Sequence, residues 1–205
     1  FHVDGFRVDA VSNIIYYLGN PQNGINEGAC DFLRNLSRNL FAYDDRVLLM
    51  AEDSSAHDGV TRPVDMGGLG FNYKWNMGWM NDTLKYFKLD PIYRQYHHNL
   101  ITFGLVYAFS EQFILPLSHD EVVHLKASLL NKMPGDYWQK FAGYRLLLGE
   151  MYTYPGKKLL FMGGEFAHYH EWKDKEELDW HLLTYPMHEK ASRFSADLNK
   201  VYLKE

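Results

Sequence analysis

Residues 46–52 read Arg-Val-Leu-Leu-Met-Ala-Glu, a short apolar run that ends in a carboxylate. The run has the length of a β-strand and does not alternate cleanly between apolar and polar residues, which is typical of a parallel strand buried on both faces. Three further runs of this kind lie at residues 3–8, 113–117 and 158–162. The pattern predicts a parallel sheet.

Amphipathic helices are expected between these runs, because apolar residues recur there at steps of three and four. Asp136 is predicted to cap the start of the second helix, and Pro155-Gly156 to end it. The predicted apolar faces of the three helices are Ala29, Leu33, Leu36 and Leu40; Tyr137, Phe141, Tyr144, Leu148 and Met151; and Met187, Ala191, Phe194, Leu198 and Val201.

The spacing of the runs predicts one more strand. The long interval between residues 51 and 113 contains residues 70–74, an apolar stretch that follows the turn at Gly67-Gly68. Five strands that alternate with helices indicate an α/β fold. A barrel of eight strand–helix units needs about 250 residues, so if the 205 residues belong to a barrel, three of its units are missing from them.

The composition excludes several classes of protein. The formal net charge is -5 and no basic cluster occurs, so the chain lacks the electrostatic footprint of a nucleic-acid partner. All apolar runs are far shorter than the roughly 18 residues of a membrane span, which predicts a soluble chain with no membrane partner. The single cysteine, Cys30, can form neither an internal disulfide nor a thiolate zinc cage.

Neither a cofactor nor a metal site is expected. The stretch at residues 67–70 lacks the spacing of a dinucleotide-binding loop and reads as a turn. His119 and His124 are five residues apart, about 140° around a helix, so they would not share the face that a zinc helix needs. Trp75 and Trp79 could stack on sugar rings, but aromatic residues at helical spacing favour the core.

Three acidic residues follow strands. Asp9 comes after the run at 3–8, Glu52 after the run at 46–51, and Asp120 after the run at 113–117. Active sites of parallel barrels lie at the carboxyl ends of the strands, where these acids are expected. For each acid alone, a structural role as a helix cap or ion pair explains the pattern as well as a catalytic role does. Together, with Arg7 and His119 beside them, they indicate acid–base and covalent chemistry on an uncharged substrate.

Longer motifs around these acids carry a resemblance. Residues 5–11, 50–54 and 115–124 resemble the second, third and fourth conserved regions of the α-amylase superfamily, and more narrowly those of its glycogen (1,4-α-glucan) branching enzymes. Residues 60–80 are similar to the branching-enzyme version of the sixth barrel strand and helix, and residues 157–166 to the eighth strand. The resemblance implies a partial TIM (β/α)8 barrel with roughly strands 4 to 8 and their helices.

The resemblance also implies roles for the acids. Asp9 would be the nucleophile, Glu52 the general acid/base, and Asp120 the carboxylate that stabilises the transition state. Arg7 and His119 would bind the sugar. A retaining glycosyl transfer needs the nucleophile and the acid about 5 to 5.5 Å apart, so the carboxyl oxygens of Asp9 and Glu52 are expected within about 6 Å. The implied substrates are α-1,4-glucans such as glycogen, amylose and starch, and the implied compartment is the cytoplasm.

The sequence departs from the family pattern in some places. It opens on Phe1 without an initiator Met and lacks the first conserved region, so residues 1–205 are expected to be the C-terminal portion of a catalytic barrel. The N-terminal barrel part, the carbohydrate-binding module and the C-terminal β-domain are expected to be absent. Leu125 stands where a Gly is expected, and His168 where a Gln is expected.

Two other functions stay open from the sequence. One is a hydrolase of the same superfamily, such as an amylase or trehalohydrolase, although residues 65–80 argue against it. The other is a non-catalytic glucan-binding or structural piece of a barrel. The intact Asp9, Glu52 and Asp120 argue against the second possibility.

Overall fold

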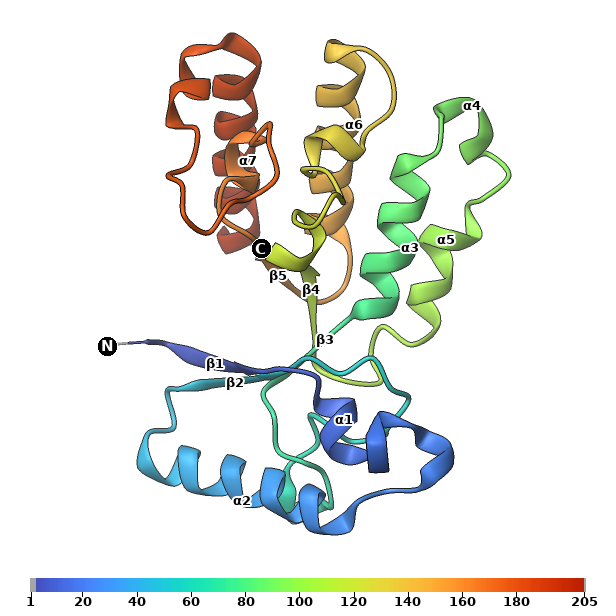
Figure 1. Ribbon diagram of the computed structural model, residues 1–205, viewed down its shortest axis with the longest axis vertical. Coiled ribbons are helices and arrows are strands. Elements are labelled where there is room, and N and C mark those ends of the chain that lie inside the picture. Colours follow the sequence, from blue (N-terminus) through green and yellow to red (C-terminus); the bar gives the residue numbers. More distant parts are fainter. Residues whose placement is uncertain (1–2, 205) are drawn as a thin grey trace. The chain divides into compact units, whose positions relative to one another are not determined.

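The computed structural model describes residues 3–204, which form helices and parallel strands in alternation (Figure 1). Five strands make one sheet in the order β1-β2-β3-β4-β5, which is also their order along the chain. The chain divides into two compact units, residues 1–78 with 105–114 and residues 79–104 with 115–205. In the described part of the chain, no helix combines the length and the apolar composition that crossing a membrane requires.

The first unit contains the strands β1 (Gly5–Val8), β2 (Leu48–Ala51) and β3 (Tyr73–Trp75), and the first residues of β4 (Phe113–Leu117). β1 pairs with β2, β2 with β3, and β3 with β4, each in parallel. Helices α1 (Val11–Ile15) and α2 (Glu27–Tyr43) lie together on one side of β1 and β2 (Figure 1). The predicted parallel sheet is therefore confirmed.

The apolar core of this unit lies between the sheet and its two helices. It is formed by Val11, Ile15, Cys30, Leu33, Leu49, Ala51, Val60, Leu69 and Phe71. The fully buried residues of α2 are Cys30, Leu33 and Ser37. Of the predicted face, Leu33 is confirmed, Leu40 is partly buried against this core, and Ala29 and Leu36 are half-buried. Ser37, which the apolar pattern did not include, lies in the interior, where its hydroxyl donates a hydrogen bond to the carbonyl of Leu69, 2.8 Å away.

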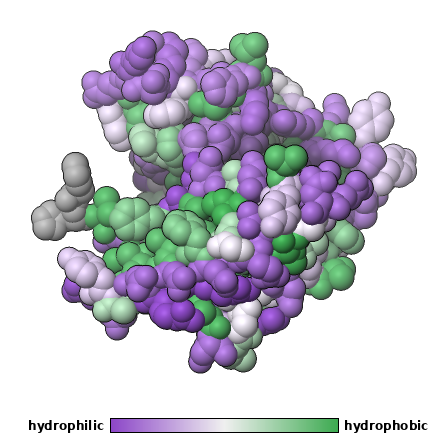
Figure 2. Space-filling model, turned by 60° about the horizontal axis from the view of Figure 1, so that its bottom comes forward, coloured by the Kyte–Doolittle hydropathy of each residue, from purple (hydrophilic) through white to green (hydrophobic). Residues whose placement is uncertain are grey.

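The strand predicted at residues 70–74 exists, but its bounds were wrong. Gly70 has a φ of +81°, a left-handed conformation that interrupts an extended chain, so the strand begins only at Tyr73. The other predicted strands agree with the structure to within two residues at each end. β1 has only β2 as its strand partner in the described sheet, which leaves apolar side chains such as Phe6 exposed. Figure 2 shows hydrophobic stretches on one face of the molecule.

The second unit contains most of α3 (Met77–Lys88), the short helices α4 (Pro91–Arg94) and α5 (Asn99–Thr102), the end of β4, α6 (Tyr137–Thr153), β5 (Lys157–Leu160) and α7 (Pro186–Lys204). The backbone N–H of Phe161, just after β5, donates to the carbonyl of Leu117 at the end of β4. Helices α6 and α7 pack side by side (Figure 1).

The predicted ends of α6 are confirmed. Asp136 caps the helix and forms a capping box with Gln139, and the helix ends before Pro155-Gly156. The predicted face of α7 was only partly right, because its buried residues are His188, Ala191 and Ser195. His188 is drawn inside by a hydrogen bond from its ring to the Phe166 carbonyl and by an edge contact with the Phe141 ring. Val201, expected on the buried face, is exposed.

Candidate active site

The register of β1 and β2 brings Asp9 and Glu52 together. Val8 is the partner of Ala51, so the next residue of each strand, Asp9 and Glu52, leaves the sheet at the same end. The backbone N–H of Glu52 donates to the Val8 carbonyl at 3.0 Å, and the N–H of Val11 donates to the Glu52 carbonyl at 2.8 Å. The backbone of Glu52 is thus fixed on both sides by the chain around Asp9.

Arg7 joins the two carboxylates. Its Nη1 lies 3.0 Å from Oδ1 of Asp9, and the same nitrogen donates a hydrogen bond to Oε2 of Glu52. Two acceptors of a single nitrogen are separated by at most the sum of two hydrogen-bond lengths, about 6 Å. This arrangement agrees with the expected closeness of the two carboxyl groups. The structure thus pairs Arg7 with both acids.

The two acids differ in their contact with water. The Asp9 side chain is 72% exposed, whereas that of Glu52 is only 20% exposed. The Arg7 guanidinium lies over the Trp75 ring, 4.9 Å from its centroid, and Trp75 itself is 4% exposed. Trp75 and Trp79 are both buried, which confirms the expectation that they belong to the core.

His119 and Asp120 lie in the second unit, directly after β4. They belong to a short 3-10 helix, His119–Glu121, in which Nε2 of His119 lies 3.3 Å from Oδ1 of Asp120. The His119 ring contacts the rings of Phe161 and Trp172, with centroids 5.8 and 6.5 Å away. Both side chains are partly exposed, so the pair is accessible to a ligand.

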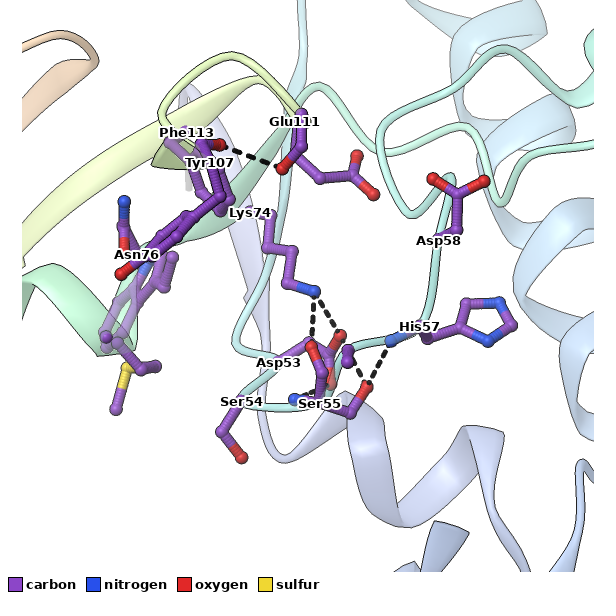
Figure 3. Close-up of a pocket in the computed structure, with 15 residues that line it drawn as sticks. Asp53, Ser54, Ser55, His57, Asp58, Lys74, Asn76, Tyr107, Glu111 and Phe113 are labelled. Atoms are coloured by element: carbon purple, nitrogen blue, oxygen red, sulfur yellow. Dashed lines mark hydrogen bonds and ion pairs between the residues drawn. The ribbon is translucent and has the colours of Figure 1, made fainter. Parts of the chain in front are cut away.

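A pocket of about 390 Å³ follows the Glu52 strand, within the first unit (Figure 3). Its lining includes residues 53–58 after β2, residues 74–78 from β3 onward, and Tyr107, Ser110, Glu111 and Phe113. An ion pair between Lys74 and Asp53, both buried, lies at its wall. Sequence reasoning missed this pair, although a lysine between Tyr73 and Trp75 in a buried strand was a signal that it needed a partner.

The two departures from the family pattern lie in the second unit. Leu125 is 98% exposed and has a φ of +65°, a left-handed conformation that glycine adopts without strain. The Gly expected there therefore has a conformational reason. Nε2 of His168 accepts a hydrogen bond from the backbone N–H of Asp179 at 3.1 Å, so this ring holds a loop.

Residues 3–204 contain no group of three or more His, Cys, Asp or Glu side chains that could hold a metal ion. The candidate groups are two carboxylates with a shared arginine in the first unit, and a histidine–aspartate pair in the second unit. Carboxylates of this kind can act as nucleophile, acid or base toward a neutral substrate.

The most informative comparison is with curated sequences. Over 204 residues the chain is 58% identical to the 1,4-alpha-glucan branching enzyme GlgB of Bacillus subtilis (strain 168), and over 202 residues it is 59% identical to that of Bacillus cereus (strain AH820). The matches cover 100% and 98% of this chain. The chain belongs to the 1,4-alpha-glucan branching enzyme family. It spans about a third of the length of the curated branching enzymes that it matches, 32% and 31%.

Solved structures agree on the fold of this branching-enzyme segment. A cyclomaltodextrinase matches with a TM-score of 0.60 at 15% identity, over 99% of this chain and 31% of its own. A pullulanase from Bacillus acidopullulyticus matches with a TM-score of 0.57 at 16% identity, over 97% of this chain and 26% of its own. The α/β architecture is thus confirmed as part of a TIM (β/α)8 barrel. No protein-family model matches the chain.

Proposed function

We propose that residues 1–205 are the C-terminal portion of the catalytic barrel of a 1,4-α-glucan branching enzyme. The identity of 58–59% to branching enzymes along the whole chain supports the proposal. In this proposal the N-terminal barrel part, a carbohydrate-binding module and a C-terminal β-domain belong to the full-length enzyme and lie outside these residues. The experiments below therefore use the full-length enzyme.

The proposed reaction moves a glucan chain in two steps. In the first, the Asp9 carboxylate attacks the anomeric carbon, the α-1,4 bond breaks, and Glu52 gives its proton to the departing 4-oxygen. In the second, Glu52 takes the proton of a 6-hydroxyl on another glucan, whose oxygen displaces Asp9. The product is an α-1,6 branch, and the two inversions together retain the configuration.

The observation that carries the proposal is the shared guanidinium of Arg7. It bonds both Asp9 and Glu52, which supports a separation near that of retaining enzymes and shorter than the 6.5–9.5 Å of inverting ones. The difference in exposure also fits the roles. The shielded Glu52 can exchange a proton with the substrate, while the exposed Asp9 is open to attack the sugar.

We further propose that Asp120 stabilises the positive charge that develops on the sugar, and that His119 and Arg7 bind the sugar. The aromatic contacts of His119 with Phe161 and Trp172 support a fixed ring orientation for that task. The proposed substrates are α-1,4-glucans such as glycogen, amylose and starch, with no nucleic acid or membrane as partner.

The proposed compartment is the cytoplasm. The only cysteine, Cys30, is buried and free, and a chain without disulfides fits a reducing compartment. Cell fractionation with an antibody to the chain tests the compartment, and recovery of the protein outside the cytoplasm would overturn it.

The experiment that tests the roles uses Asp9→Asn and Glu52→Gln in the full-length enzyme. Asp9→Asn should lower branching of amylose by several orders of magnitude while glucan binding survives. Glu52→Gln should lose branching to a similar extent. With a fluoro-sugar donor, whose fluoride needs no proton to leave, Glu52→Gln should still form the covalent glycosyl-enzyme.

Mass spectrometry then locates the adduct, which is expected on Asp9. An adduct on Asp120 or Glu165, or wild-type branching by Asp9→Asn, would overturn the assignment. Branch linkages are counted after debranching of the product. Release of free sugars without new α-1,6 linkages would instead favour a hydrolase of the same superfamily.

A further inference from the structure

A buried ion pair lies directly beside the proposed acid. Nζ of Lys74, on β3, is 2.8 Å from Oδ2 of Asp53, the residue that follows Glu52. The side chains are 7% and 0% exposed, so water screens neither charge. Removing two such charges from water is costly, and a buried pair is weak evidence for stability by itself. Its presence next to Glu52 therefore calls for another explanation.

The pair is the centre of a hydrogen-bond network that holds the segment after Glu52 (Figure 3). Asp53 accepts from the backbone N–H of Ser55 and from its hydroxyl, both at 3.0 Å. Lys74 donates a second bond, of 2.9 Å, to the Ser55 carbonyl. The Ser55 hydroxyl in turn accepts from the backbone N–H of His57 at 3.2 Å. One lysine thus fixes both Asp53 and the turn that begins there.

Glu52 is consequently held from two directions. On its amino side, β2 pairs with β1, and the backbone of Glu52 bonds to Val8 and Val11. On its carboxyl side, Glu52 is joined by its peptide bond directly to Asp53, which belongs to the network. Lys74 is also the register partner of Ala51, the residue before Glu52. Loss of the Lys74–Asp53 pair would free one of these two anchors.

We infer that Lys74 is a positioning residue in the proposed transfer reaction. It acts through Asp53 to hold Glu52 where Glu52 can protonate the leaving oxygen. The inference rests on the proposed role of Glu52. A displacement of about 1 Å at a reacting group can cost roughly a hundredfold in rate, so a residue that touches no substrate can matter this much.

The test uses two donors that differ in their need for a proton. Cleavage of amylose requires protonation of the leaving oxygen, whereas an α-maltooligosyl fluoride releases fluoride without it. The full-length enzyme with Lys74→Met should lose 10- to 100-fold in kcat/KM on amylose. Its first-turnover release of fluoride should fall by less than about threefold. Glu52→Gln is the reference for this selectivity, and it should show the same pattern more strongly.

Two further variants keep the test decisive. Lys74→Met leaves Asp53 as an unpaired buried charge, which could prevent folding. The double variant Lys74→Met/Asp53→Asn removes that charge and should show the same selective loss. Lys158→Met is the matched control. Lys158 is also partly buried and donates to backbone carbonyls, those of Tyr154 and Gly156, and its loss should affect both donors equally.

The outcomes separate the two proposals. If Glu52→Gln is selective but the folded Lys74 variants affect both donors equally, or neither, the inference about Lys74 is overturned and the proposed function stands. If Glu52→Gln itself loses both activities equally or keeps branching, its proposed role as the acid fails. Selective loss in both Glu52→Gln and the Lys74 variants supports both.

Discussion

The guanidinium carbon of Arg7 lies 4.9 Å from the centroid of the Trp75 ring. Arg7 is on β1 and Trp75 on β3, with β2 between them in the sheet, so the contact spans three strands. The guanidinium lies over the ring while its Nη1 reaches Asp9 and Glu52. A buried aromatic residue therefore supports the cation that both proposed catalytic acids share.

Replacing Trp75 should weaken that support. A cation–π contact of this kind is worth about 0.5 to 2 kcal/mol, so Trp75→Leu should lower kcat/KM for branching by roughly 2- to 30-fold. Trp75→Phe keeps a ring and should fall between Trp75→Leu and the wild type. The indole N–H of Trp75 has no hydrogen-bond partner among the described residues, so Phe sacrifices no bond there. Initial rates of branching on amylose give the comparison.

Trp138→Leu is the control for this prediction, because Trp138 is a tryptophan of α6 that is 64% exposed. It should branch at the wild-type rate. Equal rates for Trp75→Leu and the wild type would show that Arg7 keeps its position without the ring.

Sequence patterns predicted β1, β2 and β4 because each is a short, mainly apolar run with a polar residue after it. That is also why Asp9, Glu52 and Asp120 could be found, since the end of such a run marks the carboxyl edge of the sheet. β3 was harder to delimit. It has only three residues, and the left-handed Gly70 interrupts the apolar pattern before it.

Contacts between strands could not be predicted in the same way. Periodicity states which residues share a face, but the Arg7–Glu52 and Lys74–Asp53 pairs depend on the register of neighbouring strands. Some buried residues of α2 and α7 were missed for a related reason. Ser37 and His188 are polar, and they are buried only because a backbone carbonyl lies within reach of each side chain.

Stability should depend on pH through Glu150, on α6. Burial raises the pKa of this carboxyl to about 7, although the indole N–H of Trp79 donates a hydrogen bond to it at 3.1 Å. The ordinary value is 4.5, so between these two pH values the folded enzyme holds a proton that the unfolded chain has released. Stability should therefore fall as the pH rises from about 4.5 to 7, and this contribution should be lost above pH 7.

Glu150→Gln removes the titration and keeps an acceptor for Trp79. Between pH 5 and pH 8 the melting temperature of the variant should fall less than that of the wild type. The pH-induced changes in the free energy of unfolding of the two proteins should differ by an amount on the order of a few kcal/mol. Calorimetry of the full-length enzyme at both pH values measures it. Glu189→Gln changes a carboxyl that is 46% exposed and pairs with Arg193, and it should follow the wild type. A parallel pH response of Glu150→Gln and the wild type would contradict the prediction.

The left-handed conformation of Leu125 should make glycine the more stable residue there. His124 and Ala127 also have positive φ, and Glu171 holds the segment by accepting from the backbone N–H groups of Leu125 and Ala127. Leu125→Gly removes steric strain of about 1 to 2 kcal/mol, part of which the greater entropy of unfolded glycine offsets. A gain of up to about 1 kcal/mol is expected.

Leu125→Ile sharpens the comparison, because a β-branched residue tolerates positive φ worst. The expected order of stability, measured by urea unfolding of the full-length enzyme, is Gly, then Leu, then Ile. Because the side chain is 98% exposed, loss of packing cannot produce this order. If Ile were as stable as Leu, the loop would not be held in its left-handed conformation.

The carboxylate of Glu111 should determine the order of the loop after β2. It accepts hydrogen bonds from the backbone N–H groups of Gly59, Val60 and Thr61, at 2.8, 2.9 and 2.8 Å, and from the Thr61 hydroxyl. Hydrogen bonds to a charged group contribute about 1.5 to 3 kcal/mol each, and amides left without a partner add a further cost. Glu111→Ala should therefore speed hydrogen exchange at these three amides by at least tenfold, as followed by mass spectrometry of peptides that cover residues 59–61.

Glu111→Gln keeps one acceptor oxygen and should give an intermediate rate. Asp58→Ala removes another carboxylate from the same loop, but that side chain is 75% exposed and pairs with Arg62 at the surface, so its effect should stay within about 1 kcal/mol. Equal protection in Glu111→Ala and Asp58→Ala would show that the loop is held by its backbone bonds to Leu69 and Phe71 instead.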